Sequence, residues 1–199
     1  MSEDAENKRL KAILLFGPPG SGKGTIGKSL NERAEYVHIS SGDVFRGLDP
    51  DSRGGRLFHE YASKGQLVPD EITIKIIEEH VKALAASGSY VPERQILLLD
   101  GIPRTKRQAE VLKERVDVQL ILMLEVPDVE VLVERLSKRA ELEGRSDDKD
   151  EAILRERFKV YERQTKEVLE SYPADLVRHV NANQPKFSVY EDILNILLK

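Results

Sequence analysis

The sequence contains no cysteine and no tryptophan. The lack of cysteine excludes disulfide bonds, thiolate metal sites and cysteine nucleophiles. Aromatic residues make up only 6% of the chain, so no platform for stacking nucleic-acid bases is visible. The net charge is -4, which excludes a broad attraction to nucleic acid or to anionic lipid. Any anion that this protein binds must therefore meet a local cluster of positive groups, and we expect a small ligand and no nucleic-acid partner.

Long apolar segments are also missing. No run of 18 apolar residues occurs, and residues 1–11 are polar, without the apolar core of a signal peptide. We therefore expect no membrane partner and a cytoplasmic location. The 199 residues, of which 33% are charged and 40% hydrophobic, suit one folded domain over residues 1–199, and we expect a monomer.

Short apolar segments alternate with longer helical patterns along the chain. The segments that predict buried strands are 12–16, 36–39, 96–99, 120–126 and 176–180. The helical patterns cover about 22–34, 70–86, 104–115, 129–140, 148–171 and 188–198, with short helices expected between 43 and 65. Near-continuous apolar strands between helices are typical of a parallel sheet with helices on both faces. The sequence therefore predicts an α/β fold, a three-layer α/β/α domain around a five-stranded parallel sheet, with ligands at the carboxyl ends of the strands.

A glycine-rich loop follows the first predicted strand. Residues 17–25 read GPPGSGKGT and open a predicted helix, which is the context of a phosphate-binding P-loop. In such a loop, main-chain N–H groups and the helix N-terminus hold phosphate oxygens, and the lysine bridges the outer phosphates. Gly24 occupies the usual Ser/Thr position and the hydroxyl moves to Thr25, so we expect Mg²⁺ to be held partly through water. The predicted triphosphate contacts in this loop are Gly20, Ser21, Gly22, Lys23, Gly24 and Thr25.

Two further segments follow predicted strands and carry one arginine each. Residues 100–104 read DGIPR and residues 41–46 read SGDVFR. Asp100 would lie near the metal, and Arg46 and Arg104 would clamp a monophosphate, because the planar fork of a guanidinium suits phosphate oxygens. A lone arginine is more often a surface ion-pair partner, but two of them at neighbouring strand ends beside a P-loop favour an acceptor phosphate.

Gln108 lies one helical turn beyond Arg104, on the same face of the predicted helix. Its amide offers one donor and one acceptor, which match the N6 amino group and N1 of adenine. Cytosine presents a similar pair, so the amide alone leaves the base open.

Arginines also gather in the second half of the chain. Arg135 and Arg139 lie at positions i and i+4 of a predicted helix, where like charges repel unless an anion lies between them. Arg145 and Arg157 follow, interleaved with acidic residues. A charged helix surface would explain the pattern, but the arginine pair at i and i+4 also suits a bound phosphate.

These motifs, in order over residues 11–198, resemble the adenylate kinase family of nucleoside monophosphate kinases. The P-loop ends in GKGT as in that family, DGIPR resembles DGFPR or DGYPR, SGDVFR resembles TGDLLR, and residues 66–69 match the stretch whose backbone touches the acceptor base. Only five residues separate Arg139 from Arg145, which is similar to the short-lid form. Ile102 departs from the family pattern by losing an aromatic ring. The stretch from Asp148 to the arginine that follows it is one residue longer than is usual in the family. Arg157 is therefore preferred over Arg155 as the last active-site arginine.

The resemblance implies reversible, Mg²⁺-dependent transfer of the γ-phosphoryl group of ATP to AMP, giving two ADP. Adenylate kinases carry glutamine at the position of Gln108, whereas UMP-CMP kinases typically carry asparagine. The implied ATP contacts are the P-loop residues with Arg135 and Arg139. The implied AMP contacts are Ser41, Arg46, Val68, Gly101, Arg104, Gln108, Arg145 and Arg157. The implied catalytic residues are Lys23, Arg104, Arg139, Arg145 and Arg157, with Asp100 holding the metal through water.

The resemblance also implies two mobile segments. The acceptor-binding segment at about 40–69 and the lid at about 139–146 are expected to close over the nucleotides and exclude water. Two other functions stay open at this point. One is a UMP-CMP kinase, and the other is a catalytically silent nucleotide sensor, which the retained arginines disfavour.

Overall fold

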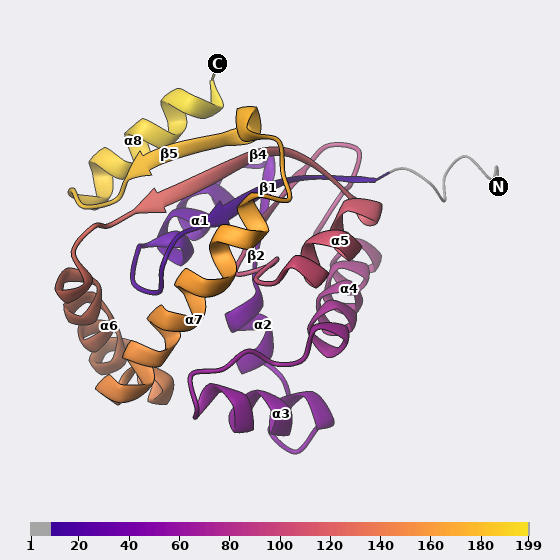
Figure 1. The fold of residues 1–199 in the computed structure, drawn as a ribbon. Coiled ribbons are helices and arrows are strands. Elements are labelled where there is room, and N and C mark those ends of the chain that lie inside the picture. Colours follow the sequence, from indigo (N-terminus) through magenta and orange to yellow (C-terminus); the bar gives the residue numbers. More distant parts are fainter. Residues whose placement is uncertain (1–8, 199) are drawn as a thin grey trace.

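The computed structural model describes residues 9–198, without the side chains at positions 146, 165 and 166. Five strands form one parallel sheet in the order β2-β3-β1-β4-β5 (Figure 1). Their bounds are β1 Leu10–Phe16, β2 Tyr36–Ser40, β3 Ile96–Asp100, β4 Val116–Glu125 and β5 Val177–Asn181. The predicted α/β fold with a five-stranded parallel sheet is confirmed.

Helices connect the strands and cover both faces of the sheet. Their bounds are α1 Lys23–Asn31, α2 Ser41–Arg46, α3 Arg53–Ala62, α4 Asp70–Ala86, α5 Lys106–Arg115, α6 Val129–Glu143, α7 Glu151–Leu169 and α8 Lys186–Leu197. Two 3₁₀ turns are η2 Ser146–Asp148 and η3 Ala174–Leu176. Among the described residues, no helix has both the length and the apolar composition needed to span a bilayer.

The two faces of the sheet bury separate hydrophobic clusters. In β1, Ile13 and Leu15 point toward one cluster with α1 and α8, while Ala12 and Leu14 point toward the other with α4 and α5. Helix α7 contributes to both clusters, at Leu154 in the first and at Val168 in the second. A strand that is buried on both faces needs apolar residues at every position, which explains its continuous apolar sequence.

Several element boundaries differ from those that the sequence predicts. Strand β4 begins at Val116 instead of residue 120 and pairs with β1 from Leu10 onward, through a register shift after Ala12. Polar residues interrupt the apolar pattern there, so the first part of β4 does not read as a buried strand. Helix α6 continues past residue 140 to Glu143 and ends where Gly144 adopts a positive φ of 65°. Helix α1 ends at Asn31, three residues before the predicted end.

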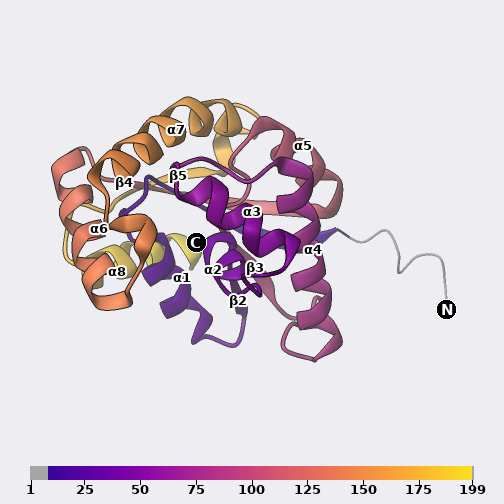
Figure 2. The same ribbon diagram turned by 90° about the horizontal axis from the view of Figure 1, so that it is seen from below.

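The carboxyl ends of all five strands meet at one edge of the sheet. Helices α2 and α3 lie beyond that edge, at the bottom of Figure 1. Viewed from below, α6, α7, α5 and α4 curve around α2 and α3 (Figure 2). The loops that follow the strands therefore open into one shared region, which holds the candidate site.

Candidate active site

The loop between β1 and α1 has a backbone that only glycine can supply at its key positions. Gly17, Gly20 and Gly22 have φ values of 148°, 82° and 98°. A Cβ at Gly17 would also lie 2.7 Å from the carbonyl oxygen of Leu124. Ser21 is 2% exposed, and its Oγ has no hydrogen-bond partner within residues 9–198. The loop thus holds a buried hydroxyl donor beside the N-terminus of α1, where a phosphate oxygen would be favourable.

Lys23 lies at the first position of α1, and its ammonium points back into this loop. Its Nζ donates to the carbonyl oxygens of Gly17 at 2.7 Å and Pro18 at 3.0 Å. Burial between the cavity walls lowers the pKa of Lys23 to about 8, with further lowering by nearby guanidinium groups and an opposing effect of Asp100. The ammonium is therefore in a place where an added anion would stabilise its charge.

Asp100 ends β3 next to the start of α1. Its side chain is 9% exposed, and its Oδ2 lies 3.5 Å from His38 Nε2 and 3.6 Å from the place where a Cβ on Gly24 would be. Burial acts to raise the pKa of Asp100, but the contact with His38 and the charges of Lys23 and Arg104 outweigh it and hold the pKa below its usual value. The site therefore contains an ionised carboxylate beside the phosphate loop.

Arg46 and Arg104 reach the cavity from two neighbouring strand ends. Arg104 Nε donates to the Gly101 carbonyl oxygen at 2.7 Å, and a Cβ at Gly101 would come within 2.7 Å of both Arg104 and Ser41. Arg46 lies 2.6 Å from Asp43 on its own helix. The cavity walls and the neighbouring Arg157 lower the pKa of Arg104 to about 10. Because its guanidinium faces the open cavity and that pKa is well above neutral, Arg104 stays charged.

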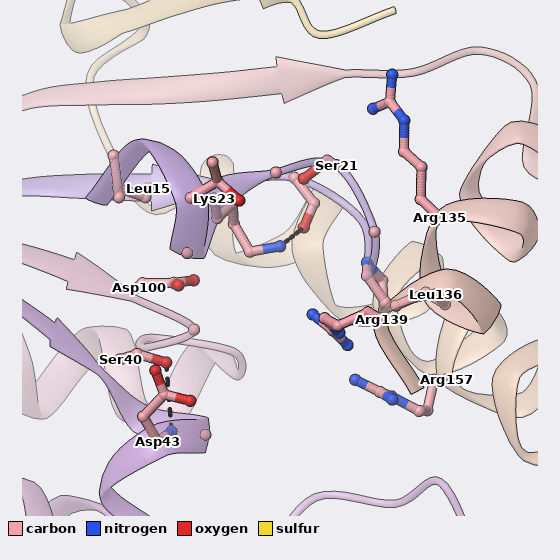
Figure 3. A pocket seen from close by; sticks show the side chains of 18 of the residues that line it. Leu15, Ser21, Lys23, Ser40, Asp43, Asp100, Arg135, Leu136, Arg139 and Arg157 are labelled. Carbon is pink, nitrogen blue, oxygen red and sulfur yellow. Dashed lines mark hydrogen bonds between the residues drawn. The ribbon is translucent and has the colours of Figure 1, made fainter. Parts of the chain in front are cut away.

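Arg139 and Arg157 share one buried carboxylate. The Asp148 side chain has 0% exposure; one oxygen accepts from Arg139 Nη2 at 2.6 Å and from Nε at 2.7 Å, and the other accepts from Arg157. Asp147 lies 3.3 Å from Arg157 as well. Figure 3 shows Arg139 and Arg157 on one side of the cavity, facing Lys23 and Asp100 on the other. A fixed pair of guanidinium groups thus faces the phosphate loop.

Arg135 and Arg145 occupy opposite ends of the same wall. Arg135 Nη1 donates to the Ala182 carbonyl oxygen at 3.0 Å, in the loop after β5. Arg145 lies 2.6 Å from Glu143 and 3.4 Å from Asp43 across the cavity. Arg135 therefore faces the outer end of the cavity beside α8, and Arg145 faces the segment of α2.

A smaller recess adjoins the main cavity beyond α2. It is lined by Ser41, Val68 and Gln108 together with two aromatic rings. The rings of Phe45 and Phe58 stack with centroids 5.5 Å apart and an interplanar angle of 13°. An apolar recess with one buried amide suits a nucleobase.

The structure brings the sequence-predicted residues together around these two spaces. The main cavity has a volume of about 750 Å³. Its walls include Gly20, Ser21, Gly22, Lys23, Gly24, Thr25, Arg46, Asp100, Gly101, Arg104, Arg135, Arg139, Arg145 and Arg157. Ser41, Val68 and Gln108 line the recess instead. Arg155 does not line either space: it is exposed and pairs with Glu151 at 2.6 Å and Glu130 at 3.6 Å.

Several residues that line the cavity were not predicted from the sequence. Asp43 and Phe58 could be recognised only once the segment between β2 and α4 is folded over the sheet edge. Ala182 and Gln184 also line the main cavity. For these two a signal existed, since they directly follow β5 and so had to lie at the same carboxyl edge.

Among the described residues, no three His, Asp or Glu side chains gather closely enough to hold a metal ion unaided. Asp100 is the carboxylate placed beside the phosphate loop, and Thr25, in the first turn of α1, lines the same cavity. Magnesium accepts such a set, because it commonly takes one or two protein oxygens and fills its other positions with water and substrate phosphates. The residues present therefore fit a nucleotide-bound Mg²⁺ ion.

A phosphate loop on a parallel sheet, opposite a wall of arginines and next to a small recess lined by aromatic rings and a buried amide, defines a P-loop phosphotransferase that acts on nucleotides. The adenylate kinase family model matches residues 15–176, which is most of the chain. The chain belongs to the adenylate kinase family, and it is accordingly a kinase that transfers phosphoryl groups between adenine nucleotides.

Named relatives agree with this assignment over 80% to 94% of the chain. An adenylate kinase from Methanothrix thermoacetophila is 36% identical, covering 94% of this chain and 98% of the relative. One from Cyanothece sp. is 36% identical over 93% of this chain and 94% of the relative. One from Micrococcus luteus is 39% identical over 80% and 77%. The comparisons do not favour the alternative of a UMP-CMP kinase.

Proposed function

We propose that this protein catalyses the reversible, Mg²⁺-dependent transfer of the γ-phosphoryl group of ATP to AMP, giving two ADP. The observation that carries the proposal is the pairing of two phosphate-binding sets across one sheet edge. One set consists of main-chain amides and Lys23, and the other consists of guanidinium groups on α2, after β3 and on α7.

ATP occupies the part of the cavity between the P-loop and α6. Its phosphate oxygens accept hydrogen bonds from the main-chain N–H groups of the P-loop and the start of α1. The Lys23 ammonium moves from two carbonyl oxygens onto the outer phosphates. The adenine of ATP lies toward Arg135 and the loop after β5, since Arg135 already lies against the Ala182 carbonyl there.

AMP occupies the recess and the adjoining corner of the main cavity. Its base lies between Val68 and the ring of Phe58, with the amide of Gln108 at its edge. Its phosphate lies between Arg46 and Arg104. The base and phosphate sets are joined by Gly101, which lines both spaces and, because it lacks a side chain, lets Arg104 and Ser41 lie close to its backbone.

Mg²⁺ belongs to this proposal as the ion that neutralises the donor phosphates. Asp100 would hold it through water, next to Thr25. When bound, the ion withdraws charge from the phosphoryl oxygens that develop negative charge during transfer.

Positioning and positive charge account for the rate in this proposal. Phosphoryl transfer requires little covalent work from the protein, so the task is to align donor and acceptor and to stabilise charge on the moving group. Arg139 and Arg157, fixed by Asp148, face the P-loop across the space where that group would move. No general base is needed, because a nucleoside monophosphate has a second pKa of about 6 and its attacking oxygen is ionised at neutral pH.

Closure of two segments over the nucleotides is a further part of the proposal. Residues 40–69 would close over AMP, and residues 139–146 over the transferring phosphates. The contact of Arg145 with Asp43 at 3.4 Å joins the two segments, and Arg46 lies 3.8 Å from Asp147, which directly follows the second segment; both support an approach of the two sides. The proposal also includes a monomeric protein acting in the cytoplasm, which light scattering and cell fractionation test.

A coupled assay with AMP, UMP and CMP as acceptors and ATP as donor tests the function. We expect AMP to be phosphorylated with the highest kcat/KM and to give two ADP for each ATP consumed. A preference for CMP or UMP would replace the proposal by its UMP-CMP kinase alternative. Measurable binding of ATP and AMP without turnover would instead indicate a silent nucleotide sensor.

A further inference from the structure

The amide of Gln108 is anchored by the protein at both of its ends. Gln108 lies in α5 and is 2% exposed. Its Oε1 accepts a hydrogen bond from the main-chain N–H of Arg104 at 2.8 Å, and its Nε2 donates to Asp70 Oδ1 at 2.8 Å. Asp70 lies 38 residues earlier in the chain, at the first position of α4.

Each anchor accepts only one orientation of this amide. A main-chain N–H can only donate, and a carboxylate can only accept. A flip of the amide by 180° would set the NH₂ group of Gln108 against the N–H of Arg104 and its oxygen against the carboxylate of Asp70. The flipped amide would thus lose two hydrogen bonds and gain two repulsive contacts in a buried place.

Half of the amide's hydrogen-bonding capacity remains unused. An amide oxygen accepts two hydrogen bonds and an amide nitrogen donates two, and each atom of Gln108 uses one within the protein. Gln108 lines the recess beside Phe45 and Phe58. The protein therefore offers a base one acceptor and one donor in an order that cannot reverse.

The fixed order distinguishes bases that have the same shape. Adenine presents an amino donor at N6 and an acceptor at N1. Hypoxanthine presents an acceptor oxygen at position 6 and a donor N–H at N1, which is the reverse pair on the same ring system. A freely rotating glutamine would serve both bases equally well, whereas an anchored one serves only the first.

We propose that Asp70 is a positioning residue for acceptor selectivity, an inference that rests on the proposed function. By holding Gln108 in one orientation, Asp70 makes the recess accept a base with an amino group beside a ring-nitrogen acceptor. It makes the recess reject bases with an oxo group beside a ring N–H, such as those of IMP and GMP. The second anchor is a main-chain group, so Asp70 is the anchor that a substitution can remove.

The test compares AMP with IMP as acceptors in the full-length protein and in Asp70→Asn. In the unmodified protein, the ratio of kcat/KM for AMP to that for IMP is expected to be on the order of 100 or more. In Asp70→Asn it falls at least about tenfold, with part of the change coming from a gain for IMP. The reason is that an asparagine amide both donates and accepts, so a flipped Gln108 finds a partner at this end and is opposed only by the main-chain N–H of Arg104. Asp70→Ser removes the same constraint with a hydroxyl group, and it provides the measurement if Asp70→Asn does not fold.

Two further variants separate positioning from a general effect on α4. Glu71→Gln removes the neighbouring acidic charge from the first turn of α4; Glu71 is exposed and lies 4.0 Å from Arg107, its ion-pair partner. This control is expected to leave the AMP to IMP ratio unchanged. Asp70→Glu keeps an acceptor that cannot donate, and it is expected to retain most of the selectivity.

The outcomes distinguish this inference from the proposed function. Equal losses for AMP and IMP in Asp70→Asn, with an unchanged ratio, would overturn the positioning role. An unmodified protein that uses AMP and IMP equally would overturn it too, while leaving the kinase function intact. An unmodified protein that phosphorylates neither acceptor would contradict the proposed function itself.

Discussion

The carboxylate of Asp43 and the guanidinium of Arg145 lie 3.4 Å apart, although 102 residues separate them in the sequence. Asp43 belongs to α2, on the acceptor side of the cavity, and Arg145 follows α6 on the opposite side. Burial acts to raise the pKa of Asp43, but its hydrogen bond to Arg46 and the nearby positive charges lower it below the usual value. The pair therefore joins the two sides as an ion pair at neutral pH.

Asp43→Asn is expected to open the nucleotide-free protein. Asp43 is 39% exposed on its side chain, so its ion pair is screened by water and contributes about 0.5–1 kcal/mol. Loss of that energy changes the ratio of closed to open molecules by about two- to fivefold. Distance measurements between probes on α3 and on the turn after α6 would detect the shift, and a bound two-nucleotide analogue should restore the closed distance.

Glu143→Gln is the matched control for this experiment. Glu143 lies 2.6 Å from the same Arg145, but on the same side of the cavity. The substitution removes a negative charge beside Arg145 but no contact across the cavity. The distance distribution should therefore stay as in the unmodified protein. An equal shift in both variants would mean that the cross-cavity pair has no special effect on closure.

Asp148→Asn is expected to damage both stability and catalysis. The Asp148 carboxylate is fully buried and balances the charges of Arg139 and Arg157. An asparagine would keep one acceptor oxygen but turn an NH₂ group toward one of the two guanidinium groups. Breaking a buried ion pair of this kind costs on the order of 3 kcal/mol, and urea unfolding measures that loss directly.

The neighbouring carboxylate provides a graded comparison. Asp147 is 15% exposed and lies farther from its partners, 3.3 Å from Arg157 and 3.8 Å from Arg46. We expect Asp147→Asn to cost less than Asp148→Asn in the free energy of unfolding. If both variants lose the same amount, the geometry around Asp148 is not what fixes the two arginines.

Arg157 and Arg155 form a matched pair for testing the last active-site arginine. Both lie on α7, but Arg157 lines the main cavity and Arg155 pairs with Glu151 on the outside. Arg157→Ala should lower kcat/KM by an amount that corresponds to a loss of about 2–5 kcal/mol in transition-state stabilisation. For Arg155→Ala the corresponding change should stay within about 0.5 kcal/mol. Steady-state kinetics with ATP and AMP measure both, and the reverse pattern would assign the role to Arg155.

The P-loop and the strand-end arginines were predictable because their signals are local. A strand, a glycine-rich turn and a helix follow one another within about twenty residues around Lys23, and each strand end in a parallel sheet reaches the same edge. Knowledge of the strand order was not required to place Arg46 and Arg104 near each other. The sheet and the candidate phosphate sites could thus be predicted from the order of elements.

Contacts made by the folded-over segment could not be predicted in this way. The stack of Phe45 on Phe58, the bond from Gln108 to Asp70 and the approach of Asp43 to Arg145 depend on how α2, α3 and α4 pack beyond the sheet edge. No local pattern in the sequence encodes these distances. The start of β4 was missed for a different reason, since Asp117 and Gln119 interrupt its apolar pattern at a half-buried end.

The pKa of Lys23 leads to a prediction about ATP binding above pH 8. Its value in the folded protein is about 8, below the value of 10.5 for an ordinary lysine. The unfolded chain therefore binds more protons than the folded protein between pH 8 and pH 10.5. The charged Lys23 lowers the free energy of unfolding by its full amount below pH 8, and this loss is relieved as the pH rises to 10.5. Bound phosphates act in the opposite direction, because their negative charge favours the ammonium and raises its pKa.

Binding of ATP near pH 8.5 should consequently take up a proton, and its affinity should fall as the pH rises further. Calorimetric titrations with ATP alone, in buffers of different ionisation enthalpy, measure that proton directly. Lys23→Arg provides the control, since a guanidinium stays charged throughout this range and leaves no proton to take up. If the unmodified protein binds ATP at pH 8.5 without proton uptake, the Lys23 ammonium is already fully charged in the empty cavity. In that case, burial and the surrounding guanidinium groups do not depress its pKa, and the pH dependence of binding should match that of Lys23→Arg.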